Sequence, residues 1–276
     1  MNVIDRWSQG DALANGHRIH YYRSGGPGQA ILLAHGITDS GECWPLVAEA
    51  LAPEYDVIAW DARGHGRSET PRAPFSTVDQ ANDLIGLVAA LQLDKPVAIG
   101  HSMGANTVAN AAFLQASLFS RIVLEDPPWR DPVPGEPVRG VASYQQRLAD
   151  YHAQTVSELA AYGRANREGW SEHEFEPWAR AKHLCRAETL ERMVPGGPSW
   201  REVARGIGCP VLLLTGEPDF QASVGLGAII TAAVAKEAQS LLQQGRVVHI
   251  AHAGHNIRRE NTADYIAAVR SFLREP

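Results

Sequence analysis

Cysteine is scarce in this chain, and its arrangement is informative. Only three cysteines, Cys43, Cys185 and Cys209, occur among 276 residues. They form no CxxC pair and no metal-binding spacing, and an odd number does not suit a disulfide framework. We therefore predict three reduced, mostly buried thiols.

Positive charge and long apolar segments are also lacking. The chain has 25 Lys and Arg against 31 Asp and Glu, a formal net charge of −6, and no basic stripe that could follow a phosphate backbone. No apolar run reaches membrane length, and the N-terminus lacks the basic and apolar regions of a signal peptide. We expect a soluble cytoplasmic protein, monomer or homodimer, that acts on a small molecule and binds neither nucleic acid nor membrane.

Short runs rich in Val, Ile and Leu are abundant. They lack polar alternation, which is typical of strands buried on both faces of a parallel sheet. Helical patterns separate them, among them STVDQANDLIGLVAALQL, in which Thr77 and Gln80 have capping-box spacing. This alternation predicts an α/β fold with a doubly wound, mostly parallel sheet, whose ligands gather at the carboxyl ends of the strands. The runs are AILLAHG from Ala30, YDVIAWDARGHG from Tyr55, PVAIGHS from Pro96, RIVLED from Arg121, PVLLLTG from Pro210 and RVVHIAHAGH from Arg246.

The alternation is interrupted between residues 129 and 200. This segment opens and closes with Pro- and Gly-rich stretches and contains helical patterns without strands. We predict an α/β core in two parts, residues 1–128 and 201–276, with an inserted helical cap at 129–200. Tryptophans are concentrated in the insert, and although such residues are more often core, Trp129 and Trp178 are predicted to contact an apolar or aromatic substrate.

The stretch GHSMG, Gly100 to Gly104, follows one apolar run and precedes a helical pattern. A strand, a tight turn and a helix would hold the central Ser102 in a strained conformation at the head of the helix, and the flanking glycines avoid steric clashes. Ser102 is therefore the predicted nucleophile. A serine hydroxyl needs a base, and His255 in AHAGHNI, after the last strand run, is positioned to supply one.

The histidine needs an acid to orient it, and here several candidates remain. Asp219 in LLLTGEPD follows a strand run and gives the order serine, acid, histidine. Asp126 in VLEDPP ends the strand after the nucleophile and is the main alternative, with Glu217 and Glu125 less favoured. We predict Asp219 as the acid.

Backbone amides are expected to stabilise a tetrahedral oxyanion. Met103, which follows the nucleophile, would supply one N–H, and Ile37 in AHGITDSG would supply the other. In WDARGHGRSE, we interpret Asp61, Arg63 and His65 as residues that brace a loop.

These motifs, in this order and spacing, resemble the α/β-hydrolase superfamily, in its small cap-bearing branch. The resemblance covers residues 19–128 and 208–274 and rests on HG in AHGITDSG, DARGHGRS, GHSMG, LLLTGEPD and AGH. It implies an eight-stranded, mostly parallel sheet with helices on both faces, a Ser-acid-His triad and an oxyanion hole. Members of similar appearance include carboxylesterases, lactonases, carbon–carbon bond hydrolases and cofactor-free perhydrolases.

The sequence thus predicts a serine hydrolase that cleaves a carboxylic ester or lactone of a medium-sized apolar substrate through an acyl-enzyme. No cofactor and no metal are expected, since His249, His252 and His255 lie outside any HExxH helix and lack a carboxylate partner. The alternatives are a ligand receptor or signalling protein on the same fold, a carbon–carbon bond hydrolase, a lyase or a cofactor-free oxygenase.

Overall fold

A computed structural model of the chain describes residues 2–131, 141–220 and 226–275. The described residues form an eight-stranded sheet in the order β1-β2-β4-β3-β5-β6-β7-β8. The strands from β4 to β8 in this order are parallel, and β1 and β2 are antiparallel to their neighbours. The strands are β1 (Ser8–Ala14), β2 (His17–Arg23), β3 (Ala30–Ala34), β4 (Asp56–Trp60), β5 (Val97–His101), β6 (Arg121–Glu125), β7 (Val211–Thr215) and β8 (Gly245–His249). The prediction of an eight-stranded, mostly parallel sheet is confirmed.

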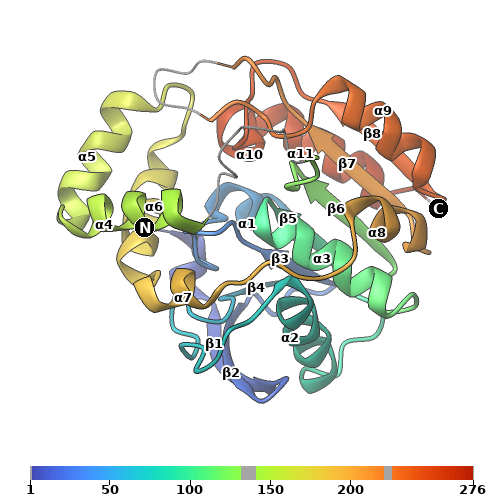
Figure 1. Cartoon of the computed structure of the whole chain (residues 1–276), viewed down its shortest axis with the longest axis horizontal. Helices are drawn as coiled ribbons and strands as arrows, with labels where there is room; N and C mark the ends of the chain where they lie inside the picture. Colours follow the sequence, from blue (N-terminus) through green and yellow to red (C-terminus); the bar gives the residue numbers. More distant parts are fainter. Residues whose placement is uncertain (1, 132–140, 221–225, 276) are drawn as a thin grey trace.

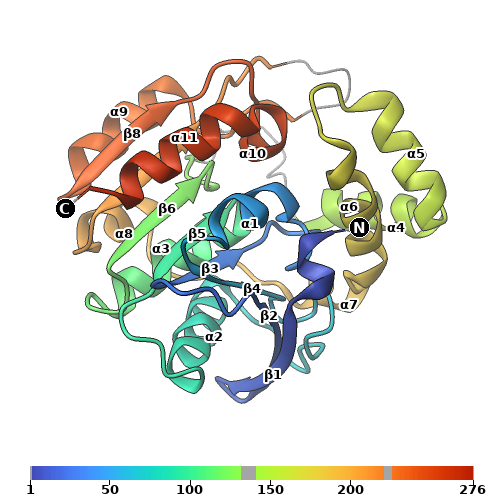
Figure 2. The ribbon, with the colours of Figure 1, turned by 180° about the vertical axis from the view of Figure 1, so that it is seen from behind.

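Helices cover both faces of the sheet (Figure 1, Figure 2). Successive side chains of β3 alternate between two hydrophobic clusters, with Leu32 and Ala34 on the face of α2, α3, α8 and α9, and Ile31 and Leu33 on the face of α1 and α11. Burial on both faces explains why this strand is apolar throughout. The helices of the core are η1 (Val3–Arg6), α1 (Pro45–Leu51), α2 (Thr77–Ala90), α3 (Met103–Leu114), α8 (Trp200–Gly206), α9 (Ala232–Leu241), α10 (Ile257–Glu260) and α11 (Thr262–Leu273).

The sequence patterns missed the first two strands. Strands β1 and β2 form a hairpin whose turn residues, Asn15 and Gly16, have φ angles of 48° and 76°. Positive φ at both positions is the signature of a type I′ turn, and Asn-Gly between extended segments was the signal that could have revealed it.

The start of α2 also differs from the prediction. The capping box is formed by Ser76 and Asp79, one residue before the predicted Thr77 and Gln80. The Asp79 carboxylate accepts hydrogen bonds from both the amide and the hydroxyl of Ser76, at 2.7 and 2.8 Å, and aspartate can close this ring as glutamate does.

In the described part of the chain between β6 and α8, four further helices stand beside the carboxyl edge of the sheet, away from its faces (Figure 1). Helices α5 and α6 share a small hydrophobic cluster built on Leu159, Phe175 and Trp178, and α4 and α7 share another around Leu148 and Leu190. We call this set the inserted helices. They are α4 (Val141–His152), α5 (Val156–Asn166), α6 (Glu172–Leu184) and α7 (Ala187–Arg192).

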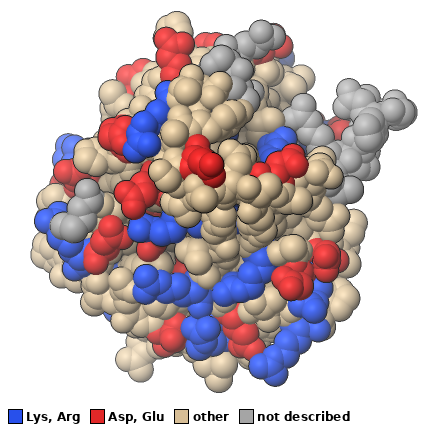
Figure 3. Space-filling view, turned by 90° about the vertical axis from the view of Figure 1, so that its left-hand side faces the viewer, with Lys and Arg blue, Asp and Glu red and all other residues tan. Residues whose placement is uncertain are grey.

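The surface of the inserted helices carries basic and acidic side chains intermixed (Figure 3). Within the three described ranges, no helix has both the length and the apolar character needed to cross a membrane. The three cysteines are free and buried, as predicted.

Candidate active site

Ser102 occupies the sharp turn between β5 and α3. Its φ and ψ angles are 52° and −113°, a combination that costs free energy for a residue with a side chain. Its amide donates to the Glu125 carbonyl at 2.9 Å, which ties the turn to the neighbouring strand β6. The helix α3 begins at Met103, so the serine lies at the N-terminal end of that helix.

The two glycines of GHSMG are required by close packing. A Cβ on Gly104 would lie 2.1 Å from the Ala34 carbonyl oxygen, and one on Gly100 would lie 2.5 Å from the Gly104 backbone. Both clashes are with backbone atoms, which cannot move aside without displacing a strand or a helix. The turn therefore depends on these two positions having no side chain.

His255 lies in the loop after β8 and faces Asp126. Its Nδ1 is 2.5 Å from Asp126 Oδ2, and both side chains are buried. Because an ionised carboxylate only accepts hydrogen bonds, Nδ1 carries the proton and Nε2 keeps its lone pair. This tautomer leaves Nε2 of His255 as a hydrogen-bond acceptor.

Asp126 is held in place by backbone amides. It follows β6 with a φ of 42°, and its carboxylate accepts from Ile229 at 2.8 Å and from Ile230 at 3.0 Å. These donors come from the segment before α9, so the carboxylate is fixed from two sides. With His255, its oxygens have three hydrogen-bond partners.

The prediction that Asp219 pairs with His255 is therefore wrong. Asp219 is exposed, in a turn that follows β7. The two less favoured acids have other partners, since Glu217 accepts from the His252 amide at 2.8 Å and Glu125 forms an ion pair with Arg258. The alternative, Asp126, is the residue that contacts the histidine. Although β7 lies between β6 and β8 in the sheet, the loop after β8 brings His255 to the carboxylate at the end of β6, which the Ile229 and Ile230 amides hold in place.

The loop that carries Ile37 has fixed peptide planes. The Ala62 amide donates to His35 Nε2 at 3.0 Å, so His35 Nδ1 donates to the Gly36 carbonyl at 2.8 Å. In a trans peptide the next N–H, that of Ile37, points the opposite way from this carbonyl. Burial lowers the pKa of His35 to about 3, which keeps it neutral and preserves this arrangement.

The loop of WDARGHGRSE forms hydrogen bonds with the loop that carries Ile37. Asp61 accepts from the amides of Gly41 and Arg67, at 2.7 and 2.8 Å, and His65 Nε2 lies 2.6 Å from the Ile37 carbonyl oxygen. Arg63 forms a buried ion pair with Asp83. These contacts agree with the interpretation of the loop as a brace.

A cavity of about 400 Å³ lies between the inserted helices and the carboxyl edge of the sheet. Ser102, His255 and Ile37 line it from the core, and Trp178 lines it from α6. Its wall also holds four cationic side chains that the sequence patterns did not single out: Arg147, Arg167, Lys182 and Arg259. Five aromatic residues line the cavity: Tyr144, Tyr151, Tyr162, Trp170 and Trp178.

The prediction for Trp129 does not match the structure. Its side chain is 1% exposed and belongs to the core cluster on the α2 and α3 face. Its ring stacks on Trp200, with centroids 5.7 Å apart and planes at 17°. Trp129 therefore packs in the core, and it is not among the residues that line the cavity.

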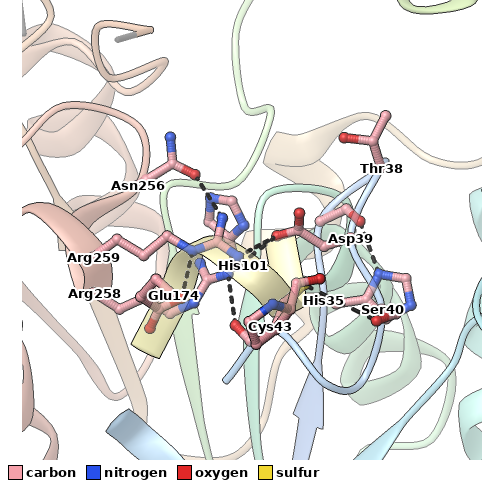
Figure 4. Close-up of polar contacts among 12 residues, drawn as sticks. His35, Thr38, Asp39, Ser40, Cys43, His101, Glu174, Asn256, Arg258 and Arg259 are labelled. Carbon is pink, nitrogen blue, oxygen red and sulfur yellow. Dashed lines mark hydrogen bonds and ion pairs between the residues drawn. The ribbon is translucent and has the colours of Figure 1, made fainter. Parts of the chain in front are cut away.

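A buried ion cluster joins the inserted helices to the core (Figure 4), and its members Asp39, Lys182 and Arg259 line the same cavity as Ser102. At its centre Asp39 contacts Lys182 at 2.6 Å, Arg259 at 3.1 Å and Arg258 at 3.2 Å. Burial would raise the pKa of Asp39, but these three cations outweigh that effect and hold the pKa well below its ordinary value. The cluster is completed by Glu174 on Arg259 and Glu125 on Arg258.

The cluster also holds the Ile37 loop. Lys182, from α6, donates to both the carbonyl and the hydroxyl oxygen of Thr38 at 3.0 Å, in addition to its ion pair with Asp39. All three ammonium donors are thus used. The position of the loop depends on a side chain from the inserted helices.

Lys182→Met is expected to lower the free energy of unfolding by about 3 kcal/mol, because it leaves the buried Asp39 with one cation fewer and Thr38 without its donor. Urea denaturation followed by tryptophan fluorescence measures this. The matched control is Lys236→Met, since Lys236 is exposed on α9 and its loss is expected to change stability by less than about 0.5 kcal/mol. Equal stability of the two variants would contradict the assigned role of the cluster.

The fold and this geometry define an α/β hydrolase. Residues 31–269 match the Alpha/beta hydrolase family, and the chain belongs to it.

Among characterised proteins, the chain is similar to the N-formylmaleamate deformylase of Pseudomonas putida strain KT2440, with 31% identity over 272 residues that cover 97% of each chain. Among solved structures, it is similar to an N-formylmaleamic acid deformylase from Pseudomonas putida S16, with a TM-score of 0.77, 27% identity and coverage of 95% of this chain and 100% of the other. The enol-lactonase from Burkholderia xenovorans LB400 shares the fold, with a TM-score of 0.68, 21% identity and coverage of 96% and 100%.

Proposed function

We propose that this chain is a serine hydrolase that cleaves an acyl–nitrogen or acyl–oxygen bond through an acyl-enzyme. The observation that carries the proposal is that Ser102 and His255 line one cavity while His255 Nδ1 contacts the buried carboxylate of Asp126. A nucleophile, a base and an acid that orients the base are the parts needed for acyl transfer.

The proposed reaction has two stages. Ser102 Oγ attacks the substrate carbonyl while His255 Nε2 accepts its proton, and the oxyanion is held by the N–H groups of Ile37 and Met103. Collapse of this intermediate breaks the scissile bond, and the imidazolium protonates the leaving group. Water, deprotonated by the same nitrogen, then releases the acid and restores Ser102.

The first bond to test is an N-formyl amide. The deformylase relative aligns over nearly the whole chain, including both parts of the core and the inserted helices. Hydrolysis of an N-formyl amide by the route above would place the formyl group on Ser102, release the amide, and then release formate. The predicted ester or lactone activity uses the same steps with an oxygen leaving group, and we keep it as the second candidate.

The inserted helices would act as the cap predicted for residues 129–200. Tyr151, Trp170 and Trp178 line the cavity from this segment while Ser102 lines it from the core. A lid of this kind excludes water from the acyl-enzyme until the leaving group departs.

Formate release tests the proposal. With N-formylmaleamate as substrate and formate dehydrogenase as the coupling enzyme, we expect one formate per maleamate formed, at a rate at least about 1,000-fold above that of the Ser102→Ala variant. Parallel assays use p-nitrophenyl acetate and γ-butyrolactone.

The substrate that is turned over shows which kind of bond the protein cleaves. Formate release supports the deformylase class, and turnover of the ester or lactone alone supports the carboxylic-ester class. No Ser102-dependent turnover of any of the three substrates would count against the hydrolase proposal.

A further inference from the structure

We propose that the substrate carries a carboxylate and that Arg167 binds it. This inference rests on the proposed function only in taking the cavity of Ser102 and His255 as the substrate site. Arg167 lines that same cavity and follows the last residue of α5.

Aromatic rings enclose the Arg167 guanidinium. Its Cζ lies 4.7 Å from the ring centroids of both Trp170 and Trp178, and these two rings are nearly perpendicular, at 88°. The guanidinium thus sits in a corner between two indoles, which attract the cation but accept no ordinary hydrogen bonds. Its N–H donors must find partners elsewhere.

Few partners are available among the residues that the structure describes. The Nε of Arg167 is buried without a hydrogen-bond partner, and the Tyr151 hydroxyl is within hydrogen-bonding reach of the side chain. In the described part of the chain no carboxylate forms an ion pair with Arg167. The Glu260 carboxylate acts on Arg167 electrostatically, but its Oε2 accepts hydrogen bonds from the amides of Gly254 and Asn256.

The buried cations beside the cavity, in contrast, are compensated. In the buried ion cluster, Lys182, Arg258 and Arg259 face three carboxylates, those of Asp39, Glu125 and Glu174. That cluster is neutral as a whole, so the charge of Arg167 is in excess. Burial lowers the pKa of the Arg167 guanidinium, yet an arginine remains protonated in proteins.

A second cation reinforces this excess. Arg147 on α4 also lines the cavity, with its Cζ 5.5 Å from the Tyr144 ring centroid. The one further acid on the wall, Asp150, is exposed and accepts a hydrogen bond from Gln146. The end of the cavity formed by α4 and α5 is therefore positive.

A carboxylate is the anion that fits this site. A guanidinium with two aromatic walls leaves the edge of its planar fork open, and a carboxylate matches that edge with two parallel hydrogen bonds. With its carboxylate on Arg167, the substrate would present the acyl group at its opposite end to Ser102. A substrate short enough for a cavity of about 400 Å³, with a carbonyl at one end and a carboxylate at the other, meets both conditions.

Calorimetric titration of the Ser102→Ala protein with two ligands of the same shape tests this inference without turnover. Succinamate has one amide and one carboxylate, and succinamide has two amides. We expect succinamate to bind at least about 10-fold more tightly, and Arg167→Met to reduce this preference to less than about 2-fold. Arg167→Lys keeps the charge without the planar fork and is expected to retain part of the preference.

The matched control is Arg164→Met, in the last turn of the helix that Arg167 follows. Arg164 is an exposed arginine whose guanidinium pairs with Glu172, so its loss is expected to leave the preference for succinamate unchanged. Equal binding of the two ligands by the parent protein, no measurable binding of either, or an undiminished preference in Arg167→Met would overturn the carboxylate site. If Arg167→Met does not fold, Arg167→Lys decides, and an unchanged preference there would contradict a role for the fork.

The two proposals fail separately. Labelling of Ser102 in the wild-type protein by a fluorophosphonate reports the nucleophile and requires no carboxylate on the ligand. Labelling without a preference for succinamate would reject only the Arg167 site. A preference for succinamate without labelling would reject only the acyl-enzyme mechanism.

Discussion

Replacing Ser102 with alanine is expected to lower kcat by roughly 10⁵- to 10⁶-fold and to abolish labelling by a fluorophosphonate probe. The hydroxyl oxygen of Ser102 is the atom that would form the covalent bond. Without this hydroxyl, His255 has no serine proton to accept. Mass spectrometry of the labelled wild-type protein should find the probe on Ser102 alone. Within the described residues, Ser102 is the serine at a strand-to-helix turn in the cavity that His255 also lines.

The control for this experiment is Ser157→Ala. Ser157 is an exposed serine on α5, and its loss is expected to leave both turnover and labelling unchanged. Labelling of another serine, or full activity of Ser102→Ala, would show that the reaction does not pass through an acyl-enzyme at this position.

Asp126→Asn is expected to lower kcat by about 10⁴-fold with little change in KM. Both carboxylate oxygens accept from the Ile229 amide, and they differ in their second partner, which is the Ile230 amide for Oδ1 and His255 for Oδ2. An asparagine would keep its oxygen toward the backbone donors, which places its NH₂ group against His255. The histidine would then carry its proton on Nε2, and that tautomer cannot accept a proton from Ser102.

Asp219→Asn is the matched control, because it makes the same chemical change at the acid predicted from the sequence. Asp219 is exposed, so we expect its kcat to stay within about 2-fold of the wild type. Steady-state kinetics of the two variants on one substrate measures the contrast. A large loss in Asp219→Asn together with a mild effect in Asp126→Asn would reverse the assignment.

The positions of Ser102 and His255 were accessible to sequence reasoning because each depends on local chemistry. A glycine on either side of Ser102 is needed where the chain reverses between a strand and a helix, and this pattern is visible in a short stretch. The choice of acid was not local. Asp126 and Asp219 both follow strands that end at the same edge of the sheet, and the amides of Ile229 and Ile230, about a hundred residues after Asp126 in the chain, donate to Asp126. Such a contact between distant segments is not visible in a short stretch of sequence.

The substrate site was the part least accessible from the sequence. Trp129 and Trp178 both belong to the tryptophan-rich insert, yet the first stacks on Trp200 in the core and the second lines the cavity. Arg167 follows a helix that carries other charges, and such a residue is usually solvated. The nearby Trp170 was the available signal, but its contact with Arg167 depends on how α5 and α6 pack.

The ion pairs of α6 with the core limit which of the inserted helices can be exchanged independently. Through Glu174 and Lys182, this helix supplies one carboxylate and one cation to the neutral cluster beneath the cavity, whereas Arg147 and Arg167 come from α4 and the residue after α5. Exchange of the segment from α4 through Arg167 for that of a relative would therefore alter ligand preference while preserving charge balance in the interior. A chimera that also replaces α6 would have to carry matching partners for Asp39 and Arg259, or it would bury unpaired charge.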